Sequence, residues 1–244
     1  STWKAVDVDD VIFFGMLGVI LGGRIGYVLF YGLKYWAADP LYPFKIWDGG
    51  MSFHGGLIGV LVSVAIFSIR RGRRIADVFD FIAPIPGIGI FAVRIANFVN
   101  SELWGKPTDV PWGFRVDGEV RHATQLYEAA LEGLLMFVVM WWFTSRPRPR
   151  LAPAGLFLVI YGSARILVEF WRLPDAHIGY LAGGWLTMGM VLSSPMLVAG
   201  LVLLALAYQR NQPSGNFVPS TEVSPAAAGG GGPSRSGSSK VGAR

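Results

Sequence analysis

The sequence predicts an all-α fold, a polytopic membrane bundle of about six helices with a small external cap. Three observations predict it. Hydrophobic residues make up 52% of the 244 residues, and the mean hydropathy is +0.46. The apolar residues are gathered in blocks of about twenty, the length of helix that crosses ~30 Å of hydrocarbon. Short clusters of arginine follow alternate blocks, as expected for loops on the cytoplasmic side of a membrane.

Each apolar block is predicted to be one membrane helix. The last block is longer than a span needs, which favours a tilted helix or a surface segment ahead of it. Together the blocks define a membrane-embedded domain over residues 11–208. In chain order they are Val11 to Phe30, Met51 to Ile69, Val78 to Val99, Thr124 to Phe143, Leu151 to Phe170 and Leu181 to Tyr208.

The arginine clusters predict how the chain is oriented, because positive charge beside a span favours the cytoplasmic side. The connections at 31–50, 100–123 and 171–180 then face outward, and both chain ends lie inside. The longest connection, which carries Trp104 and Trp112, is the predicted external cap. The clusters are Arg70, Arg71, Arg73 and Arg74; Arg146, Arg148 and Arg150; and Arg210.

The two ends of the chain differ from the domain between them. Residues 1–10 are polar and are expected to be a cytoplasmic segment without signal peptide or anchor. Residues 209–244 are expected to be a disordered cytoplasmic tail. From Pro213 onward this tail is rich in Gly, Ser, Pro and Ala, a composition that buries too little apolar surface to fold.

The composition also excludes several kinds of chemistry. The chain contains no cysteine, so disulfides, thiolate metal ligands and a cysteine nucleophile of its own are excluded. Motifs for an acyl-serine, a nucleotide phosphate loop or a zinc hydrolase are absent, and no cofactor or metal is expected. The net charge of +5 lies beside the spans, so no nucleic-acid partner is expected either.

Arg94 is the most informative single residue, because an unpaired guanidinium in an apolar span is costly. Arg94, Asn97 and Ser101 are predicted to share one helix face near its external end. A guanidinium offers a planar fork of donors that suits the phosphate of a lipid headgroup. The alternative is a structural arginine paired with Glu102 or Glu128.

Two further arginines lie inside apolar blocks. Arg165 and Glu169 are four residues apart, so they can pair on one helix, either as scaffold or as part of a site. Arg24 lies among glycines several residues inside a helix end. It is interpreted as structural, with a long stem that can reach the interface.

His54 lies between glycine-rich residues at the external end of the second block. Histidine titrates near neutrality, so a general base is available there. The alternative is a packed histidine that bonds a carbonyl. At the same level, the fourth block opens with polar residues that either cap the helix or line the rim of a headgroup pocket. These are His122, Thr124, Gln125, Tyr127 and Glu128.

Five stretches, taken in this order, resemble the bacterial phosphatidylglycerol:prolipoprotein diacylglyceryl transferases. The similarity runs from about Asp10 to Tyr208. The signature around Arg94 is present except that Val93 replaces the usual Gly, and Thr124 stands where Ser is common. The stretches are Gly22 to Tyr31, Trp47 to Gly59, Arg94 to Gly105, Arg121 to Glu128, and Arg165 to Asp175.

The resemblance implies an enzyme of the bacterial cytoplasmic (inner) membrane, multi-pass, with its active site towards the external leaflet. It implies transfer of a diacylglyceryl group from phosphatidylglycerol to the lipobox cysteine thiol of prolipoproteins, with release of glycerol phosphate. This is the first step of lipoprotein maturation. The implied partners are phosphatidylglycerol, prolipoproteins with a lipobox cysteine, and membrane lipids.

The resemblance also implies roles for particular residues. His54 matches the family's essential histidine, and Arg94 and Arg165 are implied to bind and neutralise the lipid phosphate. Seven helices are usual in the family, and the first of them has no counterpart in this sequence. The remaining implied site residues shape or support the site: Asn97, Glu102, Gly105, Thr124, Tyr31 and Glu169.

Two other functions are consistent with buried arginines in glycine-rich helices. One is a membrane transporter for an anionic solute, which predicts internal repeats, and none is evident between the two halves. The other is an inactive scaffold that binds lipid or lipoprotein precursors.

Overall fold

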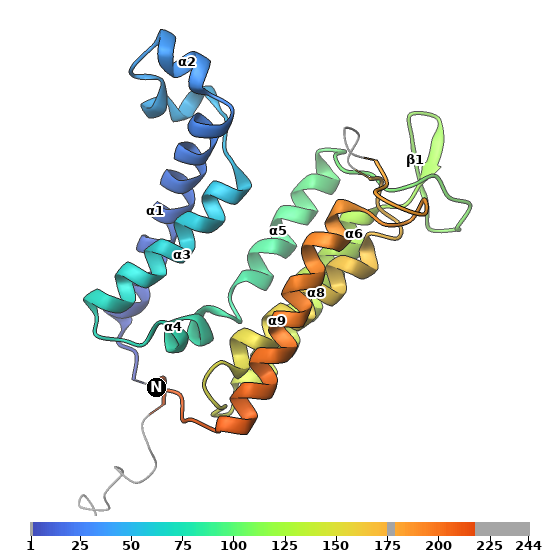
Figure 1. Ribbon diagram of the computed structural model, residues 1–244. Helices are drawn as coiled ribbons and strands as arrows, with labels where there is room; N and C mark the ends of the chain where they lie inside the picture. The colour runs from blue at the N-terminus through green and yellow to red at the C-terminus, as the bar shows by residue number, and fades with distance from the viewer. Residues whose placement is uncertain (1, 175–178, 218–244) are drawn as a thin grey trace, which may run out of the picture.

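The computed structural model describes residues 2–174 and 179–217, and it is predominantly helical. An N-terminal part holds α1 (Ala5–Phe30), α2 (Leu33–Ala38) and α3 (Phe53–Arg70). It is joined by α4 (Ile75–Ile82) to a second part that begins with α5 (Pro86–Val99) (Figure 1). The predicted all-α membrane fold is confirmed.

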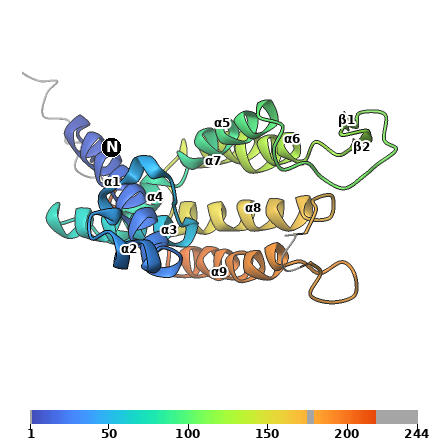
Figure 2. The same ribbon diagram turned by 90° about the horizontal axis from the view of Figure 1, so that it is seen from above.

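The second part continues with one long helical stretch and a helical pair. The stretch consists of α6 (Thr124–Glu128), a π-helix, η3 (Ala129–Leu135), and α7 (Met136–Thr144). The pair is α8 (Ala152–Val168) and α9 (Met188–Arg210), which pack along each other (Figure 2). Within the described ranges the only strands are β1 (Phe114–Val116) and β2 (Glu119–Arg121), a hairpin in the predicted cap.

In the described residues four helical segments are long and apolar enough to cross a membrane, and a fifth is added if α4 and α5 form one bent span. The second predicted block is α3, a shorter apolar helix. The third block is not the single helix that was predicted, since α4 and α5 meet at 47°. Pro84 and Pro86 explain the break, because proline lacks the backbone N–H that would continue the helix.

Three predicted boundaries differ from the structure. The first helix begins at Ala5, where the Asp7 carboxylate accepts a hydrogen bond from the Lys4 backbone N–H at 3.2 Å. The last helix begins only at Met188, after a non-helical surface segment, and the Thr187 hydroxyl caps it. Gln212, Gly215 and Asn216 of the expected tail make hydrogen bonds to Arg150 and Asp77, and residues 218–244 lie outside the described ranges.

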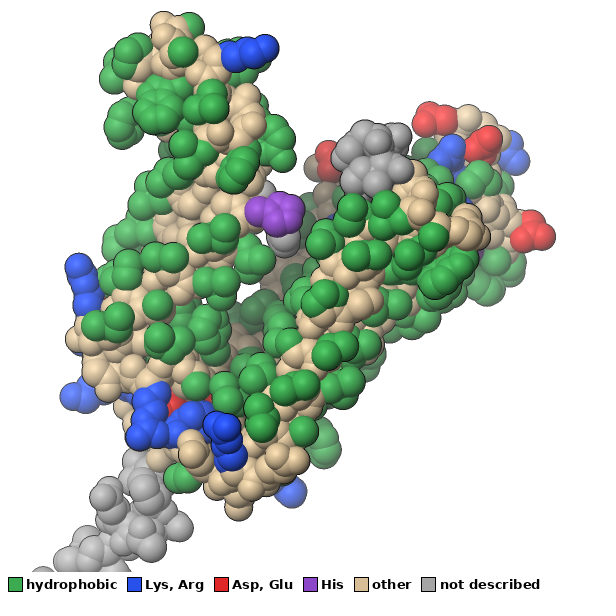
Figure 3. Space-filling model, in the orientation of Figure 1, with side chains coloured by type: hydrophobic (Ala, Val, Ile, Leu, Met, Phe, Trp, Pro, Cys, Tyr) green, Lys and Arg blue, Asp and Glu red, His purple; other side chains and the backbone are tan. Residues whose placement is uncertain are grey.

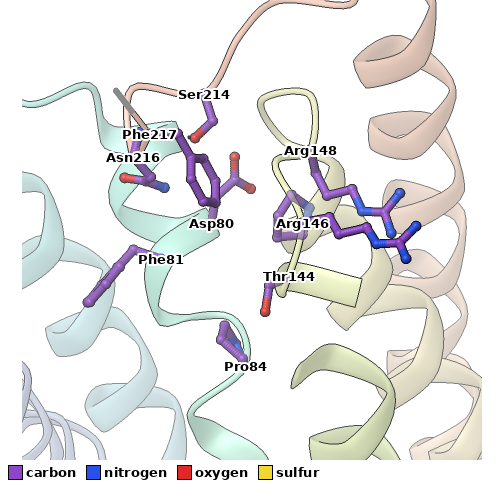
Figure 4. A pocket seen from close by; sticks show the side chains of 10 residues that line it. Asp80, Phe81, Pro84, Thr144, Arg146, Arg148, Ser214, Asn216 and Phe217 are labelled. Atoms are coloured by element: carbon purple, nitrogen blue, oxygen red, sulfur yellow. Dashed lines mark hydrogen bonds between the residues drawn. The ribbon is translucent and has the colours of Figure 1, made fainter. Parts of the chain in front are cut away.

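The end of the molecule that carries the arginine clusters, here called the arginine-rich end, ties the two parts together. Asp77 of α4 accepts hydrogen bonds from Arg150 Nε at 2.8 Å and from the Gly215 backbone N–H at 3.0 Å. Asn216 donates to the Asp77 carbonyl at 2.8 Å. A neighbouring cavity of about 210 Å³ is lined by Asp80 on one side and by Arg146 and Arg148, from the loop between α7 and α8, on the other (Figure 4).

Close contact between glycines holds α1 against α3. A Cβ on Gly22 would lie 2.8 Å from Gly59 Cα, and a Cβ on Gly26 would lie 2.8 Å from Gly55 Cα. No side chain fits between the two backbones at these positions. This pair faces the rest of the molecule across a hollow bordered mainly by hydrophobic side chains (Figure 3).

Arg24 is buried beneath the segment that follows α2. Its guanidinium donates to the carbonyls of Tyr42 at 2.5 Å, Pro43 at 3.1 Å, Lys45 at 2.8 Å and Gly50 at 3.3 Å, and also to that of Gly49. The structural role is confirmed. The guanidinium ends beneath this loop, where Arg24 is 3% exposed.

We expect Arg24→Met to release this loop, since several backbone carbonyls lose their donor at once. The free energy of unfolding should fall by at least about 3 kcal/mol. Amide hydrogen exchange over residues 39–50 should accelerate while that of α8 stays unchanged. Arg115→Met, at an exposed position on β1, is the matched control and should alter neither quantity. Unchanged exchange in the Arg24 variant would contradict this role.

Candidate active site

Arg94 of α5 and Arg165 of α8 meet at one carboxylate. Arg94 Nε lies 3.1 Å from Glu128 Oε2, and Arg165 Nη1 lies 3.2 Å from Glu128 Oε1. The two guanidinium groups, 71 residues apart in the chain by their numbers, are thereby held side by side. Of the two structural partners considered for Arg94, Glu128 is the one that it contacts.

Further charges extend this pair into a cluster. Arg165 Nη1 lies 2.9 Å from Glu169 Oε2, as expected from their spacing, and Arg172 Nη1 lies 3.8 Å from the same oxygen. Arg94 Nη2 lies 3.7 Å from Glu132 Oε2. We call this set of three arginines and three glutamates the arginine–glutamate cluster. Its members are Arg94, Arg165, Arg172, Glu128, Glu132 and Glu169.

The π-helix η3 and a close helix contact place these side chains together. Glu128 and Glu132 are four residues apart, so both point towards α5. Gly133 lets α5 approach, because a Cβ there would lie 2.7 Å from Phe91 Cβ. A π-helix inside an α-helix is often found at a functional site. The approach of α5 brings Arg94 over both carboxylates.

A cavity of about 400 Å³ opens beside the cluster. Arg94, Glu132 and Tyr161 supply its polar lining, and the remaining lining is apolar. Among the apolar lining residues, Val93 is 57% exposed. The side chain of Arg94 is 20% exposed. A ligand can therefore reach this guanidinium from the apolar surface, although carboxylates pair with it.

The loop after α5 has an unusual backbone. The helix ends at Val99, and Ser101 and Leu103 both adopt positive φ, 58° and 60°. Ser101 therefore does not share a helix face with Arg94, contrary to the prediction. Asn97 remains in the helix, where its Nδ2 donates to Glu102 Oε2 at 3.1 Å.

Thr124 and Gly105 hold this loop in place. The Thr124 hydroxyl donates to the Leu103 carbonyl at 2.9 Å, and Gln125 donates to the Glu102 carbonyl. Gly105 is required by close approach, since a Cβ would lie 2.6 Å from both Thr124 Cγ2 and the Trp171 carbonyl oxygen. Thr124 is fully buried, so its geometry suits positioning of the loop.

His54 and Tyr31 lie in the N-terminal part. His54 is exposed in the first turn of α3 and lines an apolar groove of about 600 Å³ formed by α1 and α3. Tyr31 follows α1, is largely exposed, and has its ring 5.8 Å from that of Tyr27. The structure thus gathers most of the predicted residues around Arg94 and leaves these two on the other side of the hollow.

Three members of the site were missed by sequence reasoning. Glu132, Tyr161 and Arg172 were not singled out, whereas Glu128 was considered both as a structural partner of Arg94 and as part of the rim of a headgroup pocket. A signal for Glu132 was present, because an acid inside an apolar block four residues after Glu128 is as costly as Arg94. Tyr161 lies in an ordinary apolar pattern and has no such signal.

His122 anchors the cap beside the cluster. Its Nδ1 lies 3.0 Å from the Tyr127 hydroxyl, and Trp112 Nε1 donates to the same hydroxyl at 2.9 Å. Burial lowers the pKa of His122 below the ordinary 6.5, because the charged imidazolium loses water. His122 is therefore neutral at pH 7.

We expect this shift to make the cap sensitive to acid. The unfolded chain binds a proton more readily than the folded protein, so stability is complete above about pH 6.5 and falls as the pH drops below it. A titration of imidazole NMR shifts should place the pKa of His122 below 6.5, and thermal unfolding should show the matching pH dependence. In His122→Asn, the part of the pH dependence of stability that comes from His122 should be lost. A pKa at or above 6.5 would contradict the burial argument.

The fold and the site define a class: a multispanning helical membrane protein with paired arginines at a cavity on its apolar flank. A model of the family described as prolipoprotein diacylglyceryl transferase matches residues 1–206. The chain belongs to this family.

Three relatives carry the name phosphatidylglycerol–prolipoprotein diacylglyceryl transferase. The protein of Oleidesulfovibrio alaskensis is 49% identical over 87% of this chain and 80% of its own length. That of Pseudomonas aeruginosa strain PAO1 is 53% identical over 86% of this chain and 80% of its own length. That of Methylococcus capsulatus is 53% identical over 83% of this chain and 79% of its own length.

Proposed function

We propose that this protein transfers the diacylglyceryl group of phosphatidylglycerol to the lipobox cysteine thiol of prolipoproteins and releases glycerol phosphate. One observation carries the proposal. In a member of this family, Arg94 and Arg165 come from different helices to one buried carboxylate beside an open cavity with a mostly apolar lining. Such a pair suits the phosphate of a membrane lipid.

The chemistry requires charge stabilisation at the leaving phosphate. When the thiol sulfur forms its bond to the glyceryl carbon, the carbon–oxygen bond to phosphate breaks and its electron pair stays on the phosphate oxygen. A second negative charge therefore develops there. Guanidinium forks held in place beforehand stabilise such charge without reorganisation. Glu128 keeps both forks in position.

The thiol proton needs an acceptor, since the thiolate is the nucleophile. We assign this role to His54. The lipid and the peptide then enter from the membrane through the hollow between the two parts, with the thiol towards α3 and the headgroup towards α5. Tyr31, Asn97, Glu102 and Glu169 support the two sides of this site.

The same proposal includes the orientation of the protein in the membrane. The arginine-rich end faces the cytoplasm together with the C-terminus, and the β1–β2 cap faces outward, by the preference of positive loops for the inside. The site then works at the external leaflet of the bacterial inner membrane. Its partners are phosphatidylglycerol, prolipoproteins with a lipobox cysteine and the surrounding lipids.

Mass measurement of a peptide tests the function. The full chain is incubated in phosphatidylglycerol liposomes with a lipobox peptide and with its Cys→Ser counterpart. Only the cysteine peptide should gain the mass of one diacylglyceryl group, with one glycerol phosphate released per peptide. An unmodified peptide together with uptake of an anionic solute would instead identify a transporter. Lipid binding without turnover would identify a scaffold.

A further inference from the structure

Glu132 is buried beside the cavity, and few contacts compensate the negative charge of its carboxylate. Its side chain is 0% exposed, and neither carboxylate oxygen accepts a hydrogen bond from the part of the chain that the structure describes. Arg94 Nη2, at 3.7 Å, is beyond hydrogen-bond distance. The charges and titratable groups around it come from α5 (Arg94), α6 (Glu128), α8 (Tyr161, Arg165) and the segment after α8 (Arg172).

The other two carboxylates are better held. Glu128 lies 3.1 Å and 3.2 Å from two different guanidinium groups. Glu169 lies 2.9 Å from Arg165. Protonating either would remove a short ion pair, whereas protonating Glu132 would remove only the longer contact to Arg94. Glu132 is thus the member of the cluster that loses least by becoming neutral.

The net charge of the arginine–glutamate cluster gives a reason for Glu132 to become neutral when a ligand binds. Three guanidinium groups face three carboxylates, so the formal charges cancel when all are ionised. A phosphodiester brings one further negative charge into a site of low dielectric, where an uncompensated charge is costly. Neutralising one carboxylate restores the balance and frees Arg94 Nη2 to turn to the phosphate.

We propose that Glu132 takes up one proton when a phospholipid phosphate binds at Arg94, so that Arg94 exchanges a carboxylate partner for the phosphate. Glu132 is then a positioning residue that sets the charge of the site, and it does not act on the thiol. This inference rests on the proposed function, because it requires the headgroup phosphate at Arg94.

Proton counting during lipid binding tests the proposal. Binding of short-chain phosphatidylglycerol to the full chain in detergent is measured by calorimetry in buffers of different ionisation enthalpy. Over the pH range in which Glu132 is ionised in the lipid-free protein and protonated in the complex, wild type should take up one proton per lipid bound. Its Kd should rise tenfold per pH unit there, since one bound proton is linked to one bound lipid.

The variant Glu132→Gln imitates the neutral acid. It should bind the lipid without taking up that one proton. Its Kd should therefore depend less steeply on pH than the Kd of wild type. Glu119→Gln, at an exposed position of the hairpin, is the matched control and should keep the wild-type proton count. Infrared difference spectra of wild type should gain the carbonyl band of a neutral carboxylic acid on lipid binding, and Glu132→Asp should shift that band. This keeps the test valid if the glutamine variant fails to fold.

The outcomes separate the two proposals. If wild type binds phosphatidylglycerol and modifies the peptide, but shows no proton uptake and no acid band, Glu132 does not act as proposed and the function stands. If a band appears that Glu132→Asp leaves unshifted, another group takes the proton and the assignment is overturned. If wild type neither binds the lipid nor modifies the peptide, the proposed function fails together with this inference.

Discussion

Replacing Arg94 by alanine is expected to lower the rate of diacylglyceryl transfer by about 1000-fold, because the leaving phosphate loses one of its two guanidinium donors. The change also leaves the buried Glu128 and Glu132 with less positive charge. The measurement is the initial rate of peptide modification in phosphatidylglycerol liposomes, with the amount of membrane-inserted protein determined in the same samples.

Two controls separate chemistry from folding in this variant. Arg94→Lys keeps the charge but not the planar fork, so its rate should lie between those of wild type and the alanine variant. Arg115→Ala, on the exposed face of β1, should leave the rate unchanged. A rate near that of wild type in Arg94→Ala would refute the role given to this residue.

The substitution Gly59→Leu is expected to separate α1 from α3. A Cβ at this position would overlap the Gly18 carbonyl oxygen and lie 2.8 Å from its carbon, so the two backbones must move apart. Helices in membranes depend on such close packing of small residues. We expect the free energy of unfolding to fall by about 3 kcal/mol, as measured by denaturation in mixed detergent micelles.

The matched control lies on α1 itself. A Cβ on Gly15 meets no atom within 4 Å, so Gly15→Leu should leave the unfolding free energy almost unchanged. Because α3 carries His54, the Gly59 variant should also lose transfer activity while Gly15→Leu keeps it. Equal stability of the two leucine variants would contradict the packing described for this helix pair.

Much of the fold follows from local patterns in the sequence. Blocks of apolar residues located the helices, since helix length and hydrocarbon thickness are fixed by simple geometry. Pro84 and Pro86 were also a signal for a helix break. The break was not predicted, because the apolar pattern continues across these two prolines. The start of α9 was only partly predictable: the excess length of the last block favoured a tilted helix or a segment ahead of the helix, but the apolar pattern begins at Leu181 and does not place the cap at Thr187.

Site residues could be predicted where one charged residue in an apolar span is energetically costly. The contacts between such residues and their partners could be predicted only in part. A lone arginine in an apolar span indicated Arg94. Its contact with Glu128, and the second contact of Glu128 with Arg165, depend on how three helices pack. The same holds for the position of His54 across the hollow. The spacing of residues along the chain does not predict such contacts between distant segments.

The central claim is that Arg94 and Arg165 hold the phosphate of a bound phospholipid, and a distance measurement tests it most directly. Solid-state NMR on the full chain in phosphatidylglycerol bilayers, with ¹⁵N in the arginine side chains, reports dipolar coupling between guanidinium nitrogens and lipid ³¹P. We expect a strong coupling that is reduced in Arg94→Lys and in Arg165→Lys and is unchanged in Arg115→Lys. The absence of this coupling in active wild-type protein would contradict the account.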